Sequence, residues 1–335
     1  MSSSRIYAPI VIPTLNRYDY FKKCLESLEQ CTGSEKTEVY VALDYPPSQY
    51  YVEGWRQIDE YLHKKEVENG FKKLHVIRRE RNYGICKKDG NSEQLVKEII
   101  KKVSDRFIFT EDDNEFSPNF LEYINWGLNV YKDDKSIYGI CGCQDIITET
   151  TANNVFKLNF VFSAWGFGTW IDRFDKVQEI TDHRYFRKLL KDSSITDIFS
   201  VKVFRNSSLL YQLAKKTYWG DMIVSLLPED EKWCIFPVKN KVRNWGHDGS
   251  GAHGGFTEQL RFSSLPMDED QHFEPIMTED LFNPMIHEKA CKRFKHTTKD
   301  HIKAIVNFLT YKVANRIMVH NANGKWCKVK LLKVQ

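Results

Sequence analysis

Two hydrophobic periods alternate along the first half of the chain. Phe21, Cys24, Leu25 and Leu28 recur at the i, i+3, i+4, i+7 spacing of an amphipathic helix. Short apolar runs rich in β-branched residues, which are typical of buried strands, occupy residues 6–14, 38–47, 73–84, 106–113 and 137–144. The chain therefore changes repeatedly between strand-like and helix-like segments.

Further helices are predicted between these strands. Trp55, Ile58 and Leu62 share one helical face. Residues 92–103 predict a helix with Ser92 as its N-cap, and residues 119–131 predict another after the N-cap Ser117 and the N1 proline Pro118. Strands that alternate with helices in this way predict an α/β fold with a mostly parallel, Rossmann-like sheet.

Polar residues cluster where the predicted strands end. They lie at residues 14–17, Asp44, residues 79–84 and residues 111–113. Open α/β sheets bind ligands beyond the carboxyl ends of their strands, so we expect a nucleotide there. The sequence has no GxGxxG and no GxxxxGK[ST], and therefore supports neither a dinucleotide fingerprint nor a phosphate-loop NTPase.

Three adjacent acids, Glu111, Asp112 and Asp113, follow the apolar run of residues 107–110. Their mutual repulsion requires a positive group among them. A divalent cation that bridges carboxylates to substrate phosphates would supply it. The acids alone are also explained by a solvated turn before the next helix. The buried strand before them and the motifs around them favour the metal site.

Several motifs, taken in order, resemble those of nucleotide-sugar glycosyltransferases of the GT-A fold. They are "VIPTLNRYDYFKKCLESL", "NYG", "FIFTEDDNEFSPNFLEYIN", "SAWGFGTWIDRFD" and "VRNWGHDGSGAHGG". The resemblance runs from about residue 6 to residue 256 and has two branches. One is the bacterial family-2-like transferases that make surface glycans. The other is the inverting Golgi GlcNAc-transferase of N-glycans, whose acidic motif is also Glu-Asp-Asp.

The resemblance implies how the chain would bind a sugar nucleotide. Arg17 would lie near the nucleoside and the diphosphate, and Asp44 would accept hydrogen bonds from the base or the ribose. Asn82 of "NYG" would belong to the same binding site. Glu111 and Asp112 would contact the ribose or the sugar. From the residues alone, Arg17 is also explained as a surface residue and Asp44 as a turn acid.

The resemblance also implies the reacting groups. Asp113 would bind Mn²⁺ or Mg²⁺, which stabilises the charge that develops on the diphosphate. Asp221 would be the base that takes the proton of the acceptor hydroxyl in a single inverting displacement. The glycine-rich loop 246–255 would cover the donor, with Ser250 and His253 near phosphates or metal. Asp221 is also explained as an acid at a helix N-terminus.

The composition agrees with a globular α/β protein. The 335 residues are 41% hydrophobic and 28% charged, which is ordinary for such a domain. No run of about 18 apolar residues predicts a membrane span. The eight cysteines contain no CxxC pair, so reduced core thiols are expected and a zinc site is not.

The net charge of +4 is unevenly distributed. Residues 286–335 carry twelve Lys and Arg and two acids, a net charge of +10, which leaves about −6 for the remainder. Ile302, Ile305, Val306, Leu309 and Val313 share one helical face in this basic tail. Such a helix fits attachment to an anionic membrane surface, and it equally fits packing on the catalytic domain.

The sequence thus predicts a GT-A catalytic domain at residues 1–283, followed by a basic helical extension at residues 284–335. Residues 1–145 would bind the sugar nucleotide, expected to be a UDP-sugar, and residues 146–283 would bind the glycan or lipid-linked acceptor. The alternatives are a nucleotidyltransferase acting on sugar phosphates and a nucleic-acid-binding protein. The first lacks the expected glycines near residue 14, and the acidic catalytic half opposes the second. The expected location is cytoplasmic, peripheral on the inner face of a membrane.

Overall fold

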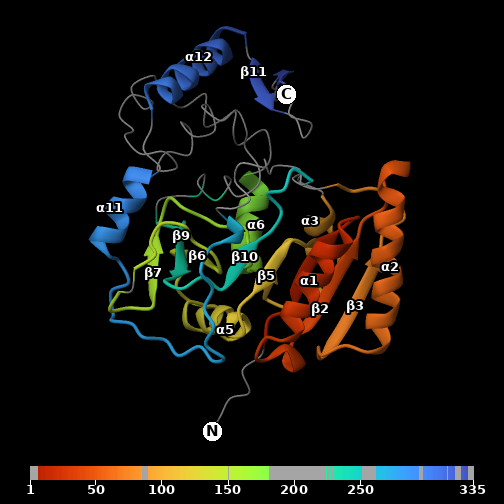
Figure 1. Ribbon diagram of the computed structural model, residues 1–335. Helices are drawn as coiled ribbons and strands as arrows, with labels where there is room; N and C mark the ends of the chain where they lie inside the picture. The colour runs from red at the N-terminus through yellow and green to blue at the C-terminus, as the bar shows by residue number, and fades with distance from the viewer. Residues whose placement is uncertain are drawn as a thin grey trace.

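An eight-stranded sheet with helices on both faces forms the centre of the molecule (Figure 1). The α/β class predicted from the alternation of strands and helices is confirmed. The computed structural model describes residues 7–84, 90–149, 151–180, 224, 227, 230–250, 262–293, 297–314, 316–320 and 326–330.

The sheet has the strand order β3-β2-β1-β4-β8-β6-β9-β7. Four neighbouring pairs are parallel, namely β1–β2, β2–β3, β1–β4 and β6–β9, so the sheet is mostly parallel as predicted. The antiparallel pairs are β4–β8, β6–β8 and β7–β9. The strand bounds are β1 Ile10–Thr14, β2 Glu38–Leu43, β3 Lys73–Arg78, β4 Arg106–Phe109, β6 Ile137–Cys141, β7 Val155–Leu158, β8 Phe167–Trp170 and β9 Trp233–Pro237.

The strand order reverses direction at β1. The chain runs from β1 to β2 and β3 on one side, and then returns to place β4 on the other side of β1. Ile10 accordingly pairs with Val39 of β2 and with Ile108 of β4. The two connections leave β1 in opposite directions, and open α/β sheets bind ligands beyond the carboxyl ends of the strands at such a point. The fold therefore places residues 110–113 beside the end of β1.

Both faces of β1 are buried, which explains its continuous apolar sequence. Ile10 and Ile12 pack with Leu25 and other residues of α1 (Tyr18–Glu29), whereas Val11 belongs to the core on the opposite face. The four residues that predicted α1, namely Phe21, Cys24, Leu25 and Leu28, are each 0% exposed. Their periodicity thus identified the helix face that covers the sheet.

The remaining helices follow the predicted segments, but two starts differ. Gly90, and not Ser92, precedes the helical segment that continues to residue 103. Asn119, and not Ser117, is the N-cap of α5, and its side chain makes no capping hydrogen bond. The bounds are α2 Val52–Val67, α3 Asn91–Leu95, the π-helical η3 Val96–Ile100, α4 Lys101–Val103, α5 Phe120–Val130 and α6 Ile171–Ile180, with 3₁₀ turns η1 Ser34–Lys36 and η2 Gln49–Tyr51.

A second, two-stranded sheet lies next to the acidic segment. β5 (Asn114–Phe116) pairs antiparallel with β10 (Val242–Asn244), and Asn114 faces Asn244 in the register. This pairing joins the segment that follows the three acids to the segment that precedes the glycine-rich loop. Two parts of the sequence about 130 residues apart therefore meet at one site.

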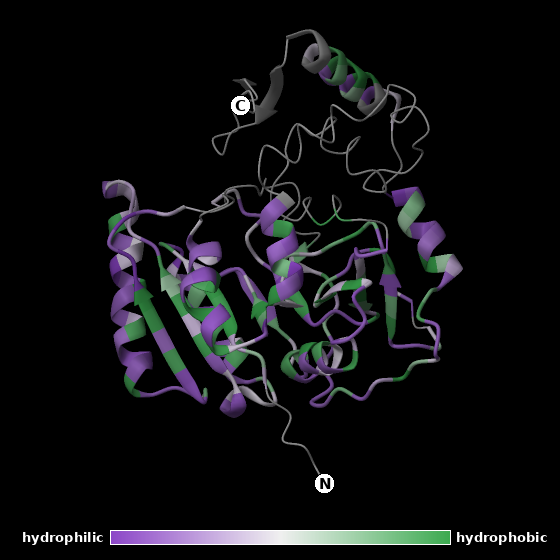
Figure 2. Ribbon diagram, turned by 180° about the vertical axis from the view of Figure 1, so that it is seen from behind, coloured by the Kyte–Doolittle hydropathy of each residue, from purple (hydrophilic) through white to green (hydrophobic). Residues whose placement is uncertain are grey.

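Hydrophobic residues concentrate in the central strands, and hydrophilic residues lie along the outer helices (Figure 2). Six of the cysteines, at positions 24, 31, 141, 143, 234 and 291, are free, and all but Cys291 are buried. The expected core thiols are present at those positions. No helix within the described residues is long and apolar enough to cross a membrane.

The C-terminal region contains more than the predicted helices. α11 (Pro284–Arg293) and α12 (Thr298–Ala314) are followed by a hairpin of β11 (Arg316–His320) and β12 (Trp326–Lys330). In β12, Lys328 and Lys330 alternate with the apolar Cys327 and Val329, which is the two-residue period of a strand. The expectation of a wholly helical extension missed this hairpin.

Candidate active site

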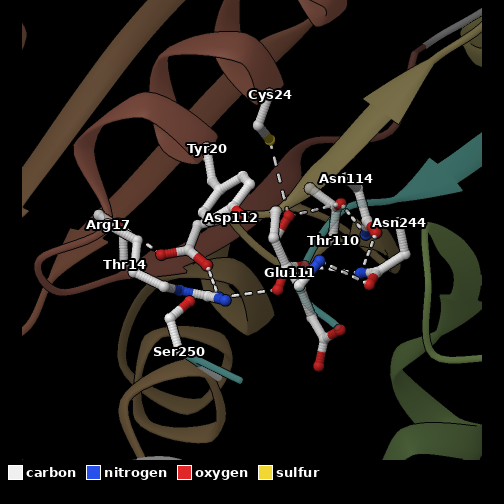
Figure 3. Close-up of polar contacts among 12 residues, drawn as sticks. Thr14, Arg17, Tyr20, Cys24, Thr110, Glu111, Asp112, Asn114, Asn244 and Ser250 are labelled. Carbon is white, nitrogen blue, oxygen red and sulfur yellow. Dashed lines mark hydrogen bonds and ion pairs between the residues drawn. The ribbon is translucent and has the colours of Figure 1, made fainter. Parts of the chain in front are cut away.

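The candidate site lies at the carboxyl ends of β1 and β4. Thr14, the last residue of β1, donates a hydrogen bond from its hydroxyl to Asp112 Oδ2 at 2.8 Å (Figure 3). Asp112 follows β4 by three residues and is 6% exposed. The two strands flanking the reversal of the sheet are thereby connected where such folds bind ligands.

Arg17 supplies the positive charge that the acid cluster requires. Its Nη2 lies 2.5 Å from Asp112 Oδ1 and 2.8 Å from Asp113 Oδ2. Burial opposes the charge of the guanidinium, but the two carboxylates outweigh this effect and raise the pKa of Arg17. The pKa of Asp112 is also raised, because burial disfavours its charged form, although the charge of Arg17 acts to lower this pKa.

Asp113 is fixed from the side of the glycine-rich loop. Asn244 donates from Nδ2 to Asp113 Oδ1 at 2.7 Å, and the backbone N–H of Trp245 donates to the Asp113 carbonyl at 2.9 Å. Gly246 follows, and a Cβ at this position would lie 1.9 Å from Asp113 Oδ2. Because that carboxylate is buried and hydrogen-bonded, only glycine allows the loop to pass so close.

The first residues of the loop are held by α1. Tyr20 donates from its hydroxyl to Asp248 Oδ2 at 2.5 Å, while Asp248 Oδ1 accepts from both the backbone N–H and the hydroxyl of Ser250. Burial and this hydrogen bond raise the pKa of Tyr20 to about 12. Sequence reasoning selected Ser250 but missed Asp248, whose only signal was an acid among glycines.

Trp165 of the "WGFGTW" segment packs on the same loop. Its ring lies edge-on to His247 at 5.3 Å and to Phe262 at 4.7 Å between centroids. Trp170, at the other end of the segment, is 2% exposed and belongs to the core under the sheet. The two tryptophans therefore have different surroundings, and only Trp165 lies beside the glycine-rich loop.

Asp44 organises the turn that follows β3. Its carboxylate accepts hydrogen bonds from the backbone N–H groups of Tyr83 at 2.9 Å and Gly84 at 2.8 Å, and from the Asn82 side chain at 3.2 Å. Gly84 has a φ of 70°, which glycine adopts most readily. The structure thus brings Asp44 and Asn82 together, as the strand-end argument expected, and shows them shaping a turn.

Glu111 differs from its two acidic neighbours in its backbone contacts. Its carbonyl accepts from Cys24 Sγ at 3.6 Å and from Thr110 Oγ1 at 3.1 Å, which fixes the segment after β4 against α1 (Figure 3). The predicted contact of Glu111 and Asp112 with a ribose or sugar stays a prediction.

A divalent cation at this site would need several oxygen ligands. No group of three or more His, Cys, Asp and Glu that could hold a metal ion exists within the described residues. Mg²⁺ and Mn²⁺ nevertheless bind through one or two carboxylates when substrate phosphates complete the coordination. Asp113 is the residue that the resemblance assigns to this role; its Oδ1 accepts from Asn244 and its Oδ2 faces Arg17, so a cation at Oδ2 would share this oxygen with the guanidinium or displace it.

Two predicted site residues, Asp221 and His253, lie outside the described residues. The roles of Asp221 as base and of His253 near phosphates or metal stay predictions of the sequence.

Comparison with known proteins gives only distant similarity. No family model and no curated protein match the chain. S. aureus TarS 1–349 is 18% identical with a TM-score of 0.34, over 49% of this chain and 47% of that chain. The mannosyltransferase PcManGT from Pyrobaculum calidifontis, in complex with GDP-Man and Mn²⁺, is 11% identical with a TM-score of 0.36, over 55% and 52%. The chain thus spans about half the length of each of these structures, and TM-scores below 0.5 carry no argument about its function.

Proposed function

We propose that the chain is an inverting, metal-dependent glycosyltransferase that uses a nucleotide-diphosphate sugar, with UDP-sugars as the first choice. The observation that carries the proposal is the cluster of Arg17, Asp112 and Asp113 beyond the ends of β1 and β4. It combines a guanidinium for phosphate with a carboxylate for a metal ion at the reversal point of the sheet. The ordered GT-A-like motifs of the sequence support the same reading.

The proposed chemistry divides among residues of this chain. Asp113 would hold Mn²⁺ or Mg²⁺, which stabilises the charge developing on the leaving diphosphate. Arg17 would bind the same diphosphate, and the turn fixed by Asp44 would border the nucleoside. Asp221 would accept the proton of the attacking hydroxyl on a glycan or lipid-linked acceptor.

Donor binding is the direct test of this proposal. The full chain is expected to show a higher melting temperature with a nucleotide-sugar and Mn²⁺ together than with either alone, because a ligand that binds only the folded state stabilises it. The measurement is thermal unfolding across a panel of UDP-, GDP- and other nucleotide-sugars, with and without Mn²⁺. If no member of the panel raises the melting temperature in the presence of metal, the proposal is wrong.

The exposed side chains of helix α12 suggest where the chain would bind its acceptor. Ile302, Val306 and Leu309 are 57%, 55% and 47% exposed at i, i+4, i+7, while Ala304 and Phe308 are buried on another face. Lys299 is exposed next to this stripe, and residues 286–335 carry a net charge of +10. An apolar stripe beside basic residues fits an anionic lipid surface, where lipid-linked acceptors reside.

The membrane contact is checked by co-sedimentation with vesicles. The chain is expected to bind vesicles containing about 30% anionic lipid and to lose about tenfold in affinity when Ile302 and Val306 are both replaced by Ser. Vesicles of neutral lipid are the control. Equal binding to both vesicle types, or no effect of the double substitution, contradicts the contact.

A further inference from the structure

The two terminal nitrogens of the Arg17 guanidinium differ in their hydrogen-bond partners. Nη2 lies within 2.8 Å of two carboxylates, whereas Nη1 is buried and has no hydrogen-bond partner in the part of the chain that the structure describes. A buried charged donor without an acceptor is costly, and such groups are usually satisfied by a ligand, an ion or water. Arg17 thus has one committed nitrogen and one that fits a further anionic oxygen.

Each of the two carboxylates has one oxygen on Arg17 and one on another residue of the chain. Asp112 is anchored through Oδ2 by Thr14 and through Oδ1 by Arg17. Asp113 is anchored through Oδ1 by Asn244, and the described contact of its Oδ2 is with the guanidinium. If the contact with Asp113 is released, Nη2 keeps Asp112 as its acceptor. Arg17 can therefore release Asp113 without leaving Nη2 unpaired.

Gly246 passes close to Nη1. A Cβ on this glycine would lie 3.2 Å from Nη1 as well as 1.9 Å from Asp113 Oδ2. The backbone of residue 246 therefore lies against both the unpaired nitrogen and the carboxylate oxygen, and ligand binding at these two atoms takes place under the start of the glycine-rich loop.

We propose that Arg17 competes with the divalent cation for Asp113, and that the diphosphate of the sugar nucleotide ends the competition by binding Arg17 through Nη1. The inference rests on the proposed function. Two positive groups at one carboxylate oxygen repel each other, so the guanidinium lowers the affinity for metal. The diphosphate binds both cations and makes their proximity favourable. Arg17 thereby makes metal and nucleotide bind cooperatively.

The test measures Mn²⁺ binding by the electron paramagnetic resonance signal of free Mn²⁺, with the full chain and with UDP as the nucleotide probe. Arg17→Gln is expected to bind Mn²⁺ alone about tenfold more tightly than the unaltered chain, and UDP is expected to increase its Mn²⁺ affinity much less. Arg17→Lys keeps the charge and is the matched control, so its Mn²⁺ affinity is expected to stay near that of the unaltered chain.

Damage to the fold cannot imitate the expected result, because a damaged site does not gain affinity. Thermal unfolding gives a second readout: Mn²⁺ is expected to raise the melting temperature of Arg17→Gln more than that of the unaltered chain, since it replaces the missing positive charge. An unchanged or weaker Mn²⁺ affinity in Arg17→Gln, or an equal effect of UDP in both proteins, overturns the inference.

Asp113→Asn separates this inference from the proposed function. If Asp113→Asn loses Mn²⁺ binding and Arg17→Gln gains none, Asp113 is still the metal ligand and only the competition is wrong. If Asp113→Asn binds Mn²⁺ like the unaltered chain, the metal site of the proposed function fails, and the competition at Asp113 fails with it.

Discussion

Asp113→Asn is expected to lower the rate of sugar transfer by about a thousandfold or more, with loss of metal-dependent donor binding. The asparagine side chain keeps the size of the carboxylate, and its oxygen can still accept from Asn244, but it carries no charge for a cation. The loss therefore falls on the stabilisation of the diphosphate leaving group. Transfer assays at saturating Mn²⁺, together with Mn²⁺ titrations of donor binding, measure it.

Substitutions of two other acids serve as comparisons for Asp113→Asn. Glu115 lies two residues further on and accepts from Trp245 Nε1 at 2.9 Å, so Glu115→Gln is expected to change transfer less than about tenfold. Asp221→Asn is expected to abolish transfer while keeping donor binding, because a base acts only on the acceptor proton. Near-normal transfer by Asp113→Asn would remove it as metal ligand, and near-normal transfer by Asp221→Asn would remove it as base.

Lys241→Met is expected to destabilise the protein by about 3–5 kcal/mol, because it leaves a buried carboxylate without its partner. Lys241 and Asp268 are 2% and 5% exposed and form an ion pair. Asp268 also accepts from Asn119 Nδ2 at 3.1 Å, and its backbone N–H donates to Asn240. The pair therefore fixes residues 262–273 next to β10, which carries Asn244 of the candidate site.

Urea denaturation of single and double variants measures the contribution of the pair. Lys241→Met combined with Asp268→Leu is expected to recover most of the loss, since no buried charge remains. Lys239→Met is the matched control. Lys239 also pairs with Asp268 and Asp270, but its side chain is 57% exposed, so its removal is expected to lower the free energy of unfolding by less than about 1 kcal/mol. A Lys241→Met variant within 1 kcal/mol of the unaltered chain contradicts the argument.

The same pair predicts a pH dependence. Burial by itself would raise the pKa of Asp268, but the hydrogen bond and charge of Lys241 outweigh it and lower that pKa below 3.8. A carboxylate whose pKa is lowered by folding stabilises the folded state above its unfolded pKa, and this stability is lost as the pH falls through the folded value. The contribution of Asp268 to the stability of the unaltered chain is therefore expected to be lost as the pH falls below about 4, measured by urea denaturation across this range.

The sequence predicted the part of the site that lies at the carboxyl ends of the strands. Arg17 and Asp113 lie in segments that were selected because polar residues follow buried apolar runs, and β1 and β4 end close to where those runs end. The resemblance then singled out these two residues. Adjacent parallel strands present their carboxyl ends at one edge of a sheet, so their proximity needed no knowledge of long-range contacts. What this argument did not reveal is that the positive group between Asp112 and Asp113 includes Arg17 of the chain itself.

The helix starts show where local rules were insufficient. Ser92 and Ser117 are good N-cap residues, yet the helices begin after Gly90 and Asn119. Asn119 is held instead by Ser117 and by Asp268, which is 149 residues away in the sequence. The side chain of Asn119 thus bonds a carboxylate that is distant in the sequence and does not cap its own helix, which local rules do not predict.

By itself, the sequence determined the α/β class, the buried faces of β1 and α1, and the position of the acids at a strand end. These features depend on periods of two and 3.6 residues, which are written in neighbouring positions. Only the tertiary structure decided that β8 enters the sheet antiparallel between β4 and β6, and that Asn244 and Gly246 enclose Asp113. The contacts of Asp113 join residues about 130 positions apart and those of β8 with β4 join residues 58 to 64 positions apart. They depend on strand register and on which buried polar groups find partners.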